Sequence, residues 1–272
     1  MTFVDKTVWI TGASSGIGEA LAKAFAEAGA HIILSGRRTD ALQQVAADIA
    51  TDTVVLPFET TDYGALPAKV EEAHSWKGKV DILVNNAGIS QRSLALDTHP
   101  DVHRKIIDVD LLAPIWLTQL LLPHMIDAGG GHIVGISSVA GRVGVPLRTA
   151  YCAAKHGLIG YMDALRAETE KLHNVHVTNI LPGSIRTNVS RNALNRKGES
   201  RGKSDAVIDM EPAECARQIL EAISSNVPEL IIAEGMELMI ANLRQSDPDQ
   251  CFATTAALGA QIAEKYEAGD DD

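Results

Sequence analysis

The sequence predicts an α/β fold in which helices cover both faces of a doubly wound, seven-stranded parallel sheet. Short apolar, β-branched runs alternate with longer helical patterns along most of the chain. Candidate functional residues follow these runs repeatedly, at the edge where open parallel sheets bind ligands. The length of 272 residues, 46% of them hydrophobic, suffices for one large α/β domain with a sizeable core. We therefore expect residues 1–272 to form a single domain.

The chain is acidic and has only scattered cysteines. Its 24 Lys and Arg residues against 35 Asp and Glu give a formal net charge of −11, which opposes nonspecific binding to nucleic acid or anionic membranes. The 3 cysteines lack metal-ligand spacing, so we expect a reducing compartment, no disulfide framework and no metal site. The amino terminus has no targeting pattern, and prolines interrupt the apolar run 111–126. We expect a cytoplasmic protein with no nucleic-acid partner and no membrane span.

A glycine-rich turn connects the first predicted strand, residues 7–10, with a helix at 19–28. Gly12, Gly16 and Gly18 would let the backbone approach a ligand closely, and the helix amino terminus offers free N–H groups to a phosphate. Their spacing differs from the commoner Gly-x-Gly-x-x-Gly fingerprint of dinucleotide sites. The turn is therefore either a phosphate site or a tight strand-to-helix connection.

Two arginines follow the second predicted strand, residues 31–35. In a dinucleotide fold an acid at this strand end binds the ribose 2′-hydroxyl, whereas an arginine accommodates a 2′-phosphate. Arg37 and Arg38 stand here, and the first acid after the strand is Asp40. The pattern favours NADP over NAD, unless the arginines only solvate the start of the helix at 39–50.

The third and fourth predicted strands, residues 53–56 and 80–84, flank a polar helix that ends near residue 76. Two asparagines, an alanine and a glycine follow the fourth strand, in the segment 85–88. The asparagine amides can bond neighbouring strand ends, and the small residues leave room for a flat ligand. The alternative is an ordinary turn.

A long helix over residues 100–125 and a buried strand over 131–136 lead to the most informative side chains. The strand delivers Ser138 at its carboxyl end, and Tyr151 and Lys155 lie four residues apart on the next helix, so they share a face. An unperturbed tyrosine has a pKa of about 10, and an adjacent cation favours the phenolate. A hydroxyl on the neighbouring strand end could hold the same substrate oxygen. Tyr-x-x-x-Lys alone also occurs by chance on exposed helices.

The rest of the chain completes the sheet and adds two less regular regions. The sixth and seventh strands are expected at 175–180 and 229–233, with a helix at 211–224 between them. Residues 188–210 are expected to form a substrate loop, whose basic character suits an anionic substrate or a solvated, flexible face. The tail at 234–272 is expected to be helical, with a disordered acidic end.

Together these segments resemble the short-chain dehydrogenase/reductase family, from about residue 6 to about residue 233. The match is carried by the glycine turn, the segment 85–88, the run 182–187, and Ser138 with Tyr151 and Lys155. The resemblance implies a Rossmann-like sheet and hydride transfer between a nicotinamide cofactor and a carbonyl or alcohol carbon. Tyr151 is then the general acid/base, Lys155 favours the phenolate and holds the nicotinamide ribose, and Ser138 orients the substrate oxygen.

The resemblance, together with the arginines after the second strand, assigns a cofactor site for NADP(H). Glu59 stands where the family usually has an aspartate that meets the adenine. The positions implied for cofactor binding are Gly12, Ser14, Ser15, Gly16, Ile17, Gly18, Arg37, Arg38, Glu59, Thr60, Asn86, Ala87, Gly88, Tyr151, Lys155, Pro182, Gly183, Ile185 and Thr187.

One active-site position departs from the family. Asp110 stands where the family usually has an asparagine, the fourth member of its proton relay. Because Pro114 has no N–H, it cannot donate the helical bond to the Asp110 carbonyl, which stays free. The resemblance implies that this carbonyl holds a water of the proton relay. We hypothesise that catalysis survives, and that a carboxylate near Lys155 favours the charged lysine and alters the pH profile. The alternative is that Asp110 points away and its chemistry is irrelevant.

The sequence therefore predicts an NADP(H)-dependent oxidoreductase acting on a small-molecule carbonyl or alcohol. The alternative is an NADP-binding regulatory protein that keeps the fold and has little turnover. We also expect a homodimer or homotetramer, because the helix after Tyr151 carries small residues, including Gly157 and Gly160, and the preceding long helix is unusually apolar. Substrate identity and reaction direction stay open.

Overall fold

The computed structural model describes residues 2–202 and 210–269, and these residues form one parallel sheet of seven strands. The strands lie in the order β3-β2-β1-β4-β5-β6-β7, and every neighbouring pair is parallel. This arrangement confirms the predicted fold class. The strands are β1 (Thr7–Thr11), β2 (His31–Ser35), β3 (Thr53–Val55), β4 (Ile82–Asn85), β5 (Gly131–Ile136), β6 (Val175–Pro182) and β7 (Glu229–Ile232).

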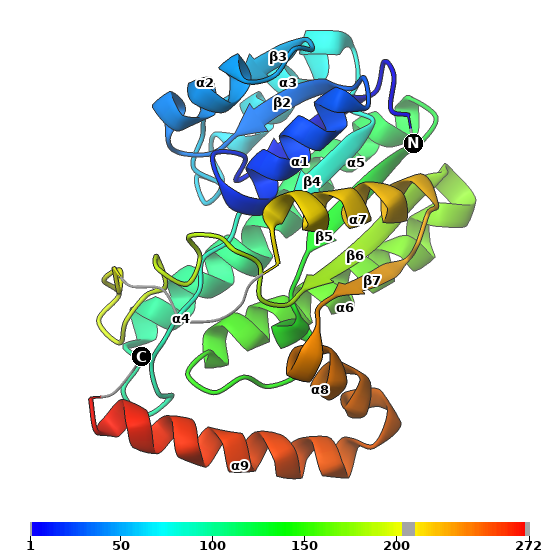
Figure 1. Cartoon of the computed structure of the whole chain (residues 1–272). Helices are drawn as coiled ribbons and strands as arrows, with labels where there is room; N and C mark the ends of the chain where they lie inside the picture. The colour runs from blue at the N-terminus through cyan, green and yellow to red at the C-terminus, as the bar shows by residue number, and fades with distance from the viewer. Residues whose placement is uncertain (1, 203–209, 270–272) are drawn as a thin grey trace.

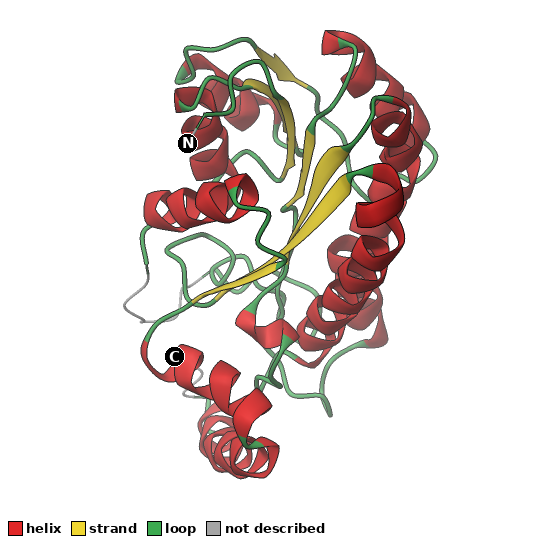
Figure 2. Cartoon of the chain, turned by 90° about the vertical axis from the view of Figure 1, so that its right-hand side faces the viewer, coloured by secondary structure: helices red, strands yellow, loops and turns green. Residues whose placement is uncertain are grey.

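Helices cover both faces of the sheet, as Figures 1 and 2 show. One face carries α1 (Gly16–Glu27), α2 (Thr39–Ala47) and α7 (Pro212–Ser224). The other face carries α3 (Leu66–Lys77), α5 (Ala113–Asp127) and α6 (Thr149–His173). Because the strands are covered on both sides, their sequences are continuous apolar runs rather than alternating ones.

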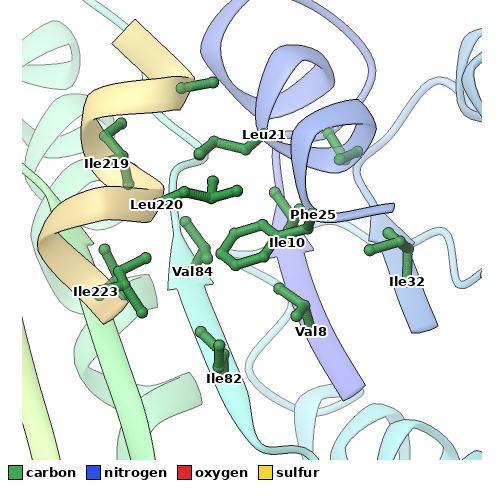
Figure 3. Close-up of a cluster of buried hydrophobic side chains, with 14 of the residues drawn as sticks. Val8, Ile10, Leu21, Phe25, Ile32, Ile82, Val84, Ile219, Leu220 and Ile223 are labelled. Atoms are coloured by element: carbon green, nitrogen blue, oxygen red, sulfur yellow. The ribbon is translucent and has the colours of Figure 1, made fainter. Parts of the chain in front are cut away.

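The core on the first face forms where α1 and α7 meet over the centre of the sheet. Phe25 of α1 and Leu220 of α7 pack above Ile10 and Val84, on β1 and β4 (Figure 3). Burial of such side chains contributes about 1.5–3 kcal/mol each to folding. The pairing of β1 with β2 and β4 sets the register of the central strands, whose carboxyl ends carry the polar residues described below.

The long helix predicted over residues 100–125 is interrupted. Its parts are α4 (Pro100–Ile107), a π-helical turn η1 (Asp108–Leu112) and α5. The expectation of one regular helix was wrong at this turn, where the Ala113 N–H donates to the carbonyl of Asp108, five residues back. The physical reason is Pro114, whose ring and missing N–H disfavour the regular α-helical bond to Asp110. The extra residue in the turn changes which side chains face the site.

Among the described residues, the stretch Pro100–Asp127 is the helix whose length and apolar composition would suffice to cross a membrane. Here it packs into the protein, and α5 contributes Leu117, Leu121 and Met125 to the core beneath the sheet.

Beyond β7 the chain forms α8 (Gly235–Ser246) and α9 (Pro248–Glu267), which pack on each other at the carboxyl edge of the sheet (Figure 1). The segment 188–202 holds only isolated bridges, such as Leu194 with Ser200. The remainder of the predicted loop, residues 203–209, and the acidic end, residues 270–272, lie outside the described residues.

Candidate active site

Ser138, Tyr151 and Lys155 line one cavity of about 1550 Å³ at the carboxyl edge of the sheet. Ser138 lies two residues beyond β5, where it precedes the short 3₁₀ helix η2 (Val139–Gly141). Tyr151 and Lys155 lie in the first two turns of α6, and the lysine Nζ is 5.5 Å from the centre of the tyrosine ring. The structure thus places the phenol and the ammonium side by side, as their spacing predicts.

Two hydrogen bonds hold the Ser138 hydroxyl. Its Oγ donates to the carbonyl of Pro182 over 3.2 Å and accepts from the Ala140 N–H over 3.1 Å. The first bond ties Ser138 to the end of β6, and the second caps η2. The hydroxyl is therefore fixed on the cavity wall, where it can meet a substrate oxygen.

Lys155 is a buried cation with two polar partners. Only 4% of its surface is exposed, its Nζ donates to the carbonyl of Ile136 over 3.0 Å, and it lies 3.2 Å from Asp110 Oδ2. Burial by itself lowers the pKa of Lys155, but the Asp110 carboxylate and Tyr151 outweigh it and raise the pKa above 10.5. The lysine is therefore charged at neutral pH.

Asp110 points into the site from the π turn η1. It is 1% exposed, and its Oδ1 accepts a hydrogen bond from the Ile89 N–H over 2.9 Å. Burial raises the pKa of Asp110, and the Lys155 ammonium opposes that rise. Although both pKa values move upward, the lysine starts far above the carboxyl, so the proton stays on Lys155 and the two groups form an ion pair. The alternative that Asp110 points away is wrong.

Gly88 makes room for this ion pair. A Cβ at Gly88 would lie 3.2 Å from Asp110 Oδ2 and 3.4 Å from Lys155 Nζ. The glycine that the sequence suggested for a flat ligand thus also accommodates two buried charges.

The glycine-rich turn follows β1 and is built by close backbone approaches. Gly12 and Gly16 have φ values of +66° and +62°, which favour glycine. A Cβ at Gly18 would lie 2.4 Å from the Gly12 carbonyl oxygen and 2.5 Å from Asn86 Nδ2. Gly18 does not line the cavity and packs behind the turn, and its contact with the cofactor stays a prediction. The other predicted site residues line the cavity.

Asn86 joins the ends of β1 and β4. Its Nδ2 donates to the Thr11 carbonyl over 2.9 Å, and the N–H groups of Asn86 and Ala87 donate to Thr11 Oγ1 over 3.0 and 3.1 Å. The side chain of Asn85 was also expected to bond a neighbouring strand end. It instead donates to Thr118 Oγ1 of α5 over 3.0 Å. One asparagine bonds a strand end and the other anchors a helix.

The two arginines after β2 have different partners. Arg38 Nη2 donates to the hydroxyls of Ser14 and Ser15 over 2.9 and 3.0 Å, so its guanidinium lies against the glycine turn. Arg37 Nη1 lies 3.5 Å from Glu59 Oε2, and the two side chains are 64% and 41% exposed. Arginine and serine groups therefore share one rim of the cavity.

The loop after β6 also lines the cavity and involves a residue that sequence reasoning missed. Glu237, on α8, accepts from the Ser184 N–H over 2.7 Å and from its hydroxyl over 2.9 Å. The same loop meets the glycine turn, because a Cβ at Gly16 would lie 2.9 Å from Thr187 Cγ2. No local pattern signals Glu237, which is 53 positions from Ser184.

These features fit an extended dinucleotide. The cavity runs between the glycine turn with its arginine rim and the Tyr151–Lys155 face of α6, and it includes Thr60 and Ile185. Its floor at Gly12 has space only because a side chain is missing, since a Cβ there would lie 2.8 Å from Ala87 Cα. The glycine turn leads into the amino terminus of α1, which suits a phosphate.

Comparison with known proteins gives consistent results. The family described as short chain dehydrogenase matches residues 6–198. The human protein dehydrogenase/reductase SDR family member 7 is 36% identical over 98% of this chain and 81% of its own length. The Drosophila melanogaster dehydrogenase/reductase SDR family protein 7-like is 39% identical over 96% of this chain and 83% of its own.

Solved structures share the fold. A short chain dehydrogenase/reductase from Burkholderia phymatum, in complex with NAD, superposes with a TM-score of 0.82 at 20% identity, over 92% of this chain and 96% of that one. A short-chain dehydrogenase from Streptomyces avermitilis superposes with a TM-score of 0.78 at 26% identity, over 99% of both chains.

Proposed function

This chain belongs to the short-chain dehydrogenase/reductase family, whose members are oxidoreductases that bind a nicotinamide cofactor, and we propose that it is an NADP(H)-dependent carbonyl reductase or alcohol dehydrogenase. The observation that carries the proposal is the side-by-side placement of Tyr151 and Lys155 across one cavity wall, with the fixed Ser138 hydroxyl on the same cavity.

The chemistry of these residues follows from their positions. A bound nicotinamide supplies or accepts the hydride at the substrate carbon. In the reductive direction, the Ser138 hydroxyl turns its one proton from the Pro182 carbonyl to the substrate carbonyl oxygen, and Tyr151 transfers its phenolic proton to that oxygen. The alcohol is released and the phenolate regains a proton from solvent. The buried Lys155 ammonium stabilises the phenolate left behind.

The preference for NADP(H) is supported by the arginine rim. Arg38 lies on the hydroxyls of Ser14 and Ser15, and a 2′-phosphate beside this guanidinium would gain charge-assisted hydrogen bonds. Arg37 is held toward Glu59, so Arg38 is the stronger candidate. Fluorescence titration should show NADPH binding at least about tenfold more tightly than NADH, and Arg38→Ala should remove most of that difference. Equal affinities in the native protein would refute the assignment.

The test of catalysis is NADPH oxidation against a panel of ketones, quinones, steroids and sugars, with reversal tested on the matching alcohols. Tyr151→Phe keeps the ring against Lys155 and removes the transferable proton. We expect it to retain NADPH binding and to lose at least about 100-fold in kcat. A native protein that binds NADPH and turns over nothing in the panel would instead support the regulatory alternative.

We also propose that the protein is a homodimer or homotetramer built on α5 and α6. Trp116 on α5 is 45% exposed, and a Cβ at Gly160 on α6 would meet nothing within 4 Å, so α6 presents a flat surface there. Flat helix surfaces that carry exposed apolar side chains can pack closely against the same surface of a second copy of the chain. Light scattering at micromolar concentration should give a multiple of the 29.0 kDa chain mass, and a monomeric mass would refute this.

A further inference from the structure

We propose that the Asp110 carboxylate, acting through Lys155, keeps Tyr151 protonated to higher pH than an asparagine would, and so adapts the site to proton donation in carbonyl reduction. This inference rests on the proposed function. Asp110 touches neither cofactor nor substrate in this scheme and is a positioning residue for the charge of Lys155.

The geometry places Lys155 between a carboxylate and a phenol. Its Nζ is 3.2 Å from Asp110 Oδ2 and 5.5 Å from the centre of the Tyr151 ring. Asp110 is 1% exposed and Lys155 4%, so solvent screens their interaction weakly. The phenol therefore faces an ammonium whose charge is largely compensated.

That compensation changes proton transfer. An ammonium alone favours a neighbouring phenolate, but a carboxylate on the far side of the ammonium opposes a second negative charge. An asparagine would remove the opposition. The Ile136 carbonyl, which accepts a hydrogen bond from Nζ, still favours the charged lysine, so the field of the ammonium on the phenol is no longer offset. Asp110 therefore widens the pH range in which Tyr151 carries the proton that reduction requires.

Few groups face the ion pair of Asp110 and Lys155. Lys155 interacts electrostatically with Asp110 from η1 and with Tyr151 from its own helix, and Asp110 interacts with Lys155. From β5 the facing group is the Ile136 carbonyl, and from the segment after β4 it is the Ile89 N–H. Other charged groups on the cavity wall are less buried and of both signs, and they include Arg92, Lys105, Asp108, Arg148 and Glu237.

The carboxylate is held firmly enough for this role. The π turn carries Asp110 into the site, the Ile89 N–H fixes Oδ1, and Gly88 leaves the space that Oδ2 occupies. An asparagine has the same shape, and its amide oxygen can keep the bond from Ile89. Asp110→Asn is therefore close to a pure removal of charge.

The expected size of the effect follows from Coulomb's law. A unit charge roughly 6–9 Å away moves a titration by about one to two pH units at an effective dielectric constant of about 20. The overall equilibrium between alcohol and carbonyl is unchanged, because an enzyme residue cannot alter it. Only the pH dependence of the rates changes, and oxidation, which needs the phenolate, shows it directly.

The kinetic test compares kcat/KM profiles for alcohol oxidation between about pH 6 and 10. In Asp110→Asn we expect the rise in oxidation rate to occur about one pH unit lower than in the native protein. Asp127→Asn is the control, because it removes the same charge from an exposed position at the carboxyl end of α5, outside the cavity lining, and its profile should superimpose on the native one. Superimposable profiles for Asp110→Asn, or an equal shift in Asp127→Asn, would overturn the inference.

A second measurement needs no turnover, so it separates failure of this inference from failure of the proposed function. Tyrosinate absorbance near 295 nm is titrated in the native protein and in Asp110→Asn, each with its Tyr151→Phe counterpart subtracted. The Tyr151 component should appear about one pH unit lower without the carboxylate. An unchanged midpoint in folded, NADPH-binding protein overturns the inference even if catalysis is established. A shifted midpoint supports it even if the substrate panel fails.

Discussion

His132 should make the fold sensitive to mild acid. It lies on β5 and is 7% exposed, and its Nε2 is 2.8 Å from Thr178 Oγ1 on β6. Because the Thr178 hydroxyl donates to the Val227 carbonyl over 2.8 Å, it accepts from the imidazole, which assigns the proton of the neutral ring to Nε2. Burial, with a smaller contribution from His176, lowers the pKa of His132 from 6.5 to about 4.

The sign and size of the effect follow from linkage. Above pH 6.5 both the folded and unfolded states hold a neutral imidazole and nothing is lost. Below it the unfolded chain takes up a proton that the folded protein refuses, until pH falls to about 4. The free energy of unfolding should therefore fall by about 2 kcal/mol between pH 7 and pH 5, and by about 3 kcal/mol in the limit.

The assay is urea denaturation at fixed protein concentration, in half-unit steps from pH 7 to pH 5. His132→Gln retains a donor toward Thr178 and removes the titration, so its stability should be nearly flat over this range. His173→Gln removes an exposed imidazole at the end of α6 and serves as the control. A native protein as flat as His132→Gln would refute the reasoning, as would a loss that persists in that variant.

Two further predictions concern the glycine turn and the loop after β6. Gly18→Ala should destabilise the protein by about 2 kcal/mol in urea denaturation and weaken NADPH binding at least about tenfold, because its Cβ would lie 2.4 Å from the Gly12 carbonyl oxygen. Gly64→Ala, whose Cβ would meet nothing closer than 3.7 Å, should do neither, and equal effects of the two changes would contradict the steric argument. Glu237→Ala should raise the Kd for NADPH several-fold, since it releases the Ser184 N–H and hydroxyl that position the loop after β6. Glu237→Gln, which keeps an acceptor oxygen, should be intermediate by the same titration, and an unchanged Kd in both would exclude a link between α8 and the cofactor site.

Local patterns were sufficient for the strands and for much of the site. The apolar runs predict the sheet because a strand buried on both faces must be apolar throughout, and this requirement is visible within four to eight residues. The glycine turn and the pairing of Tyr151 with Lys155 are equally local, since helix periodicity alone brings those two side chains together. Resemblance to a family then assigned segments that are far apart in the chain to one cofactor and catalytic site.

The sequence by itself thus determined which side chains stand at the carboxyl ends of the strands, but it left the neighbours of each one open. Only the tertiary structure decided that Asp110 faces Lys155, because a π turn shifts the helical register by one residue and the sheet order sets what lies opposite. It likewise placed Gly18 behind the turn and brought Glu237 to Ser184. Contacts between distant segments depend on how α6, η1 and α8 pack on one sheet edge, and no periodicity within a segment encodes that packing.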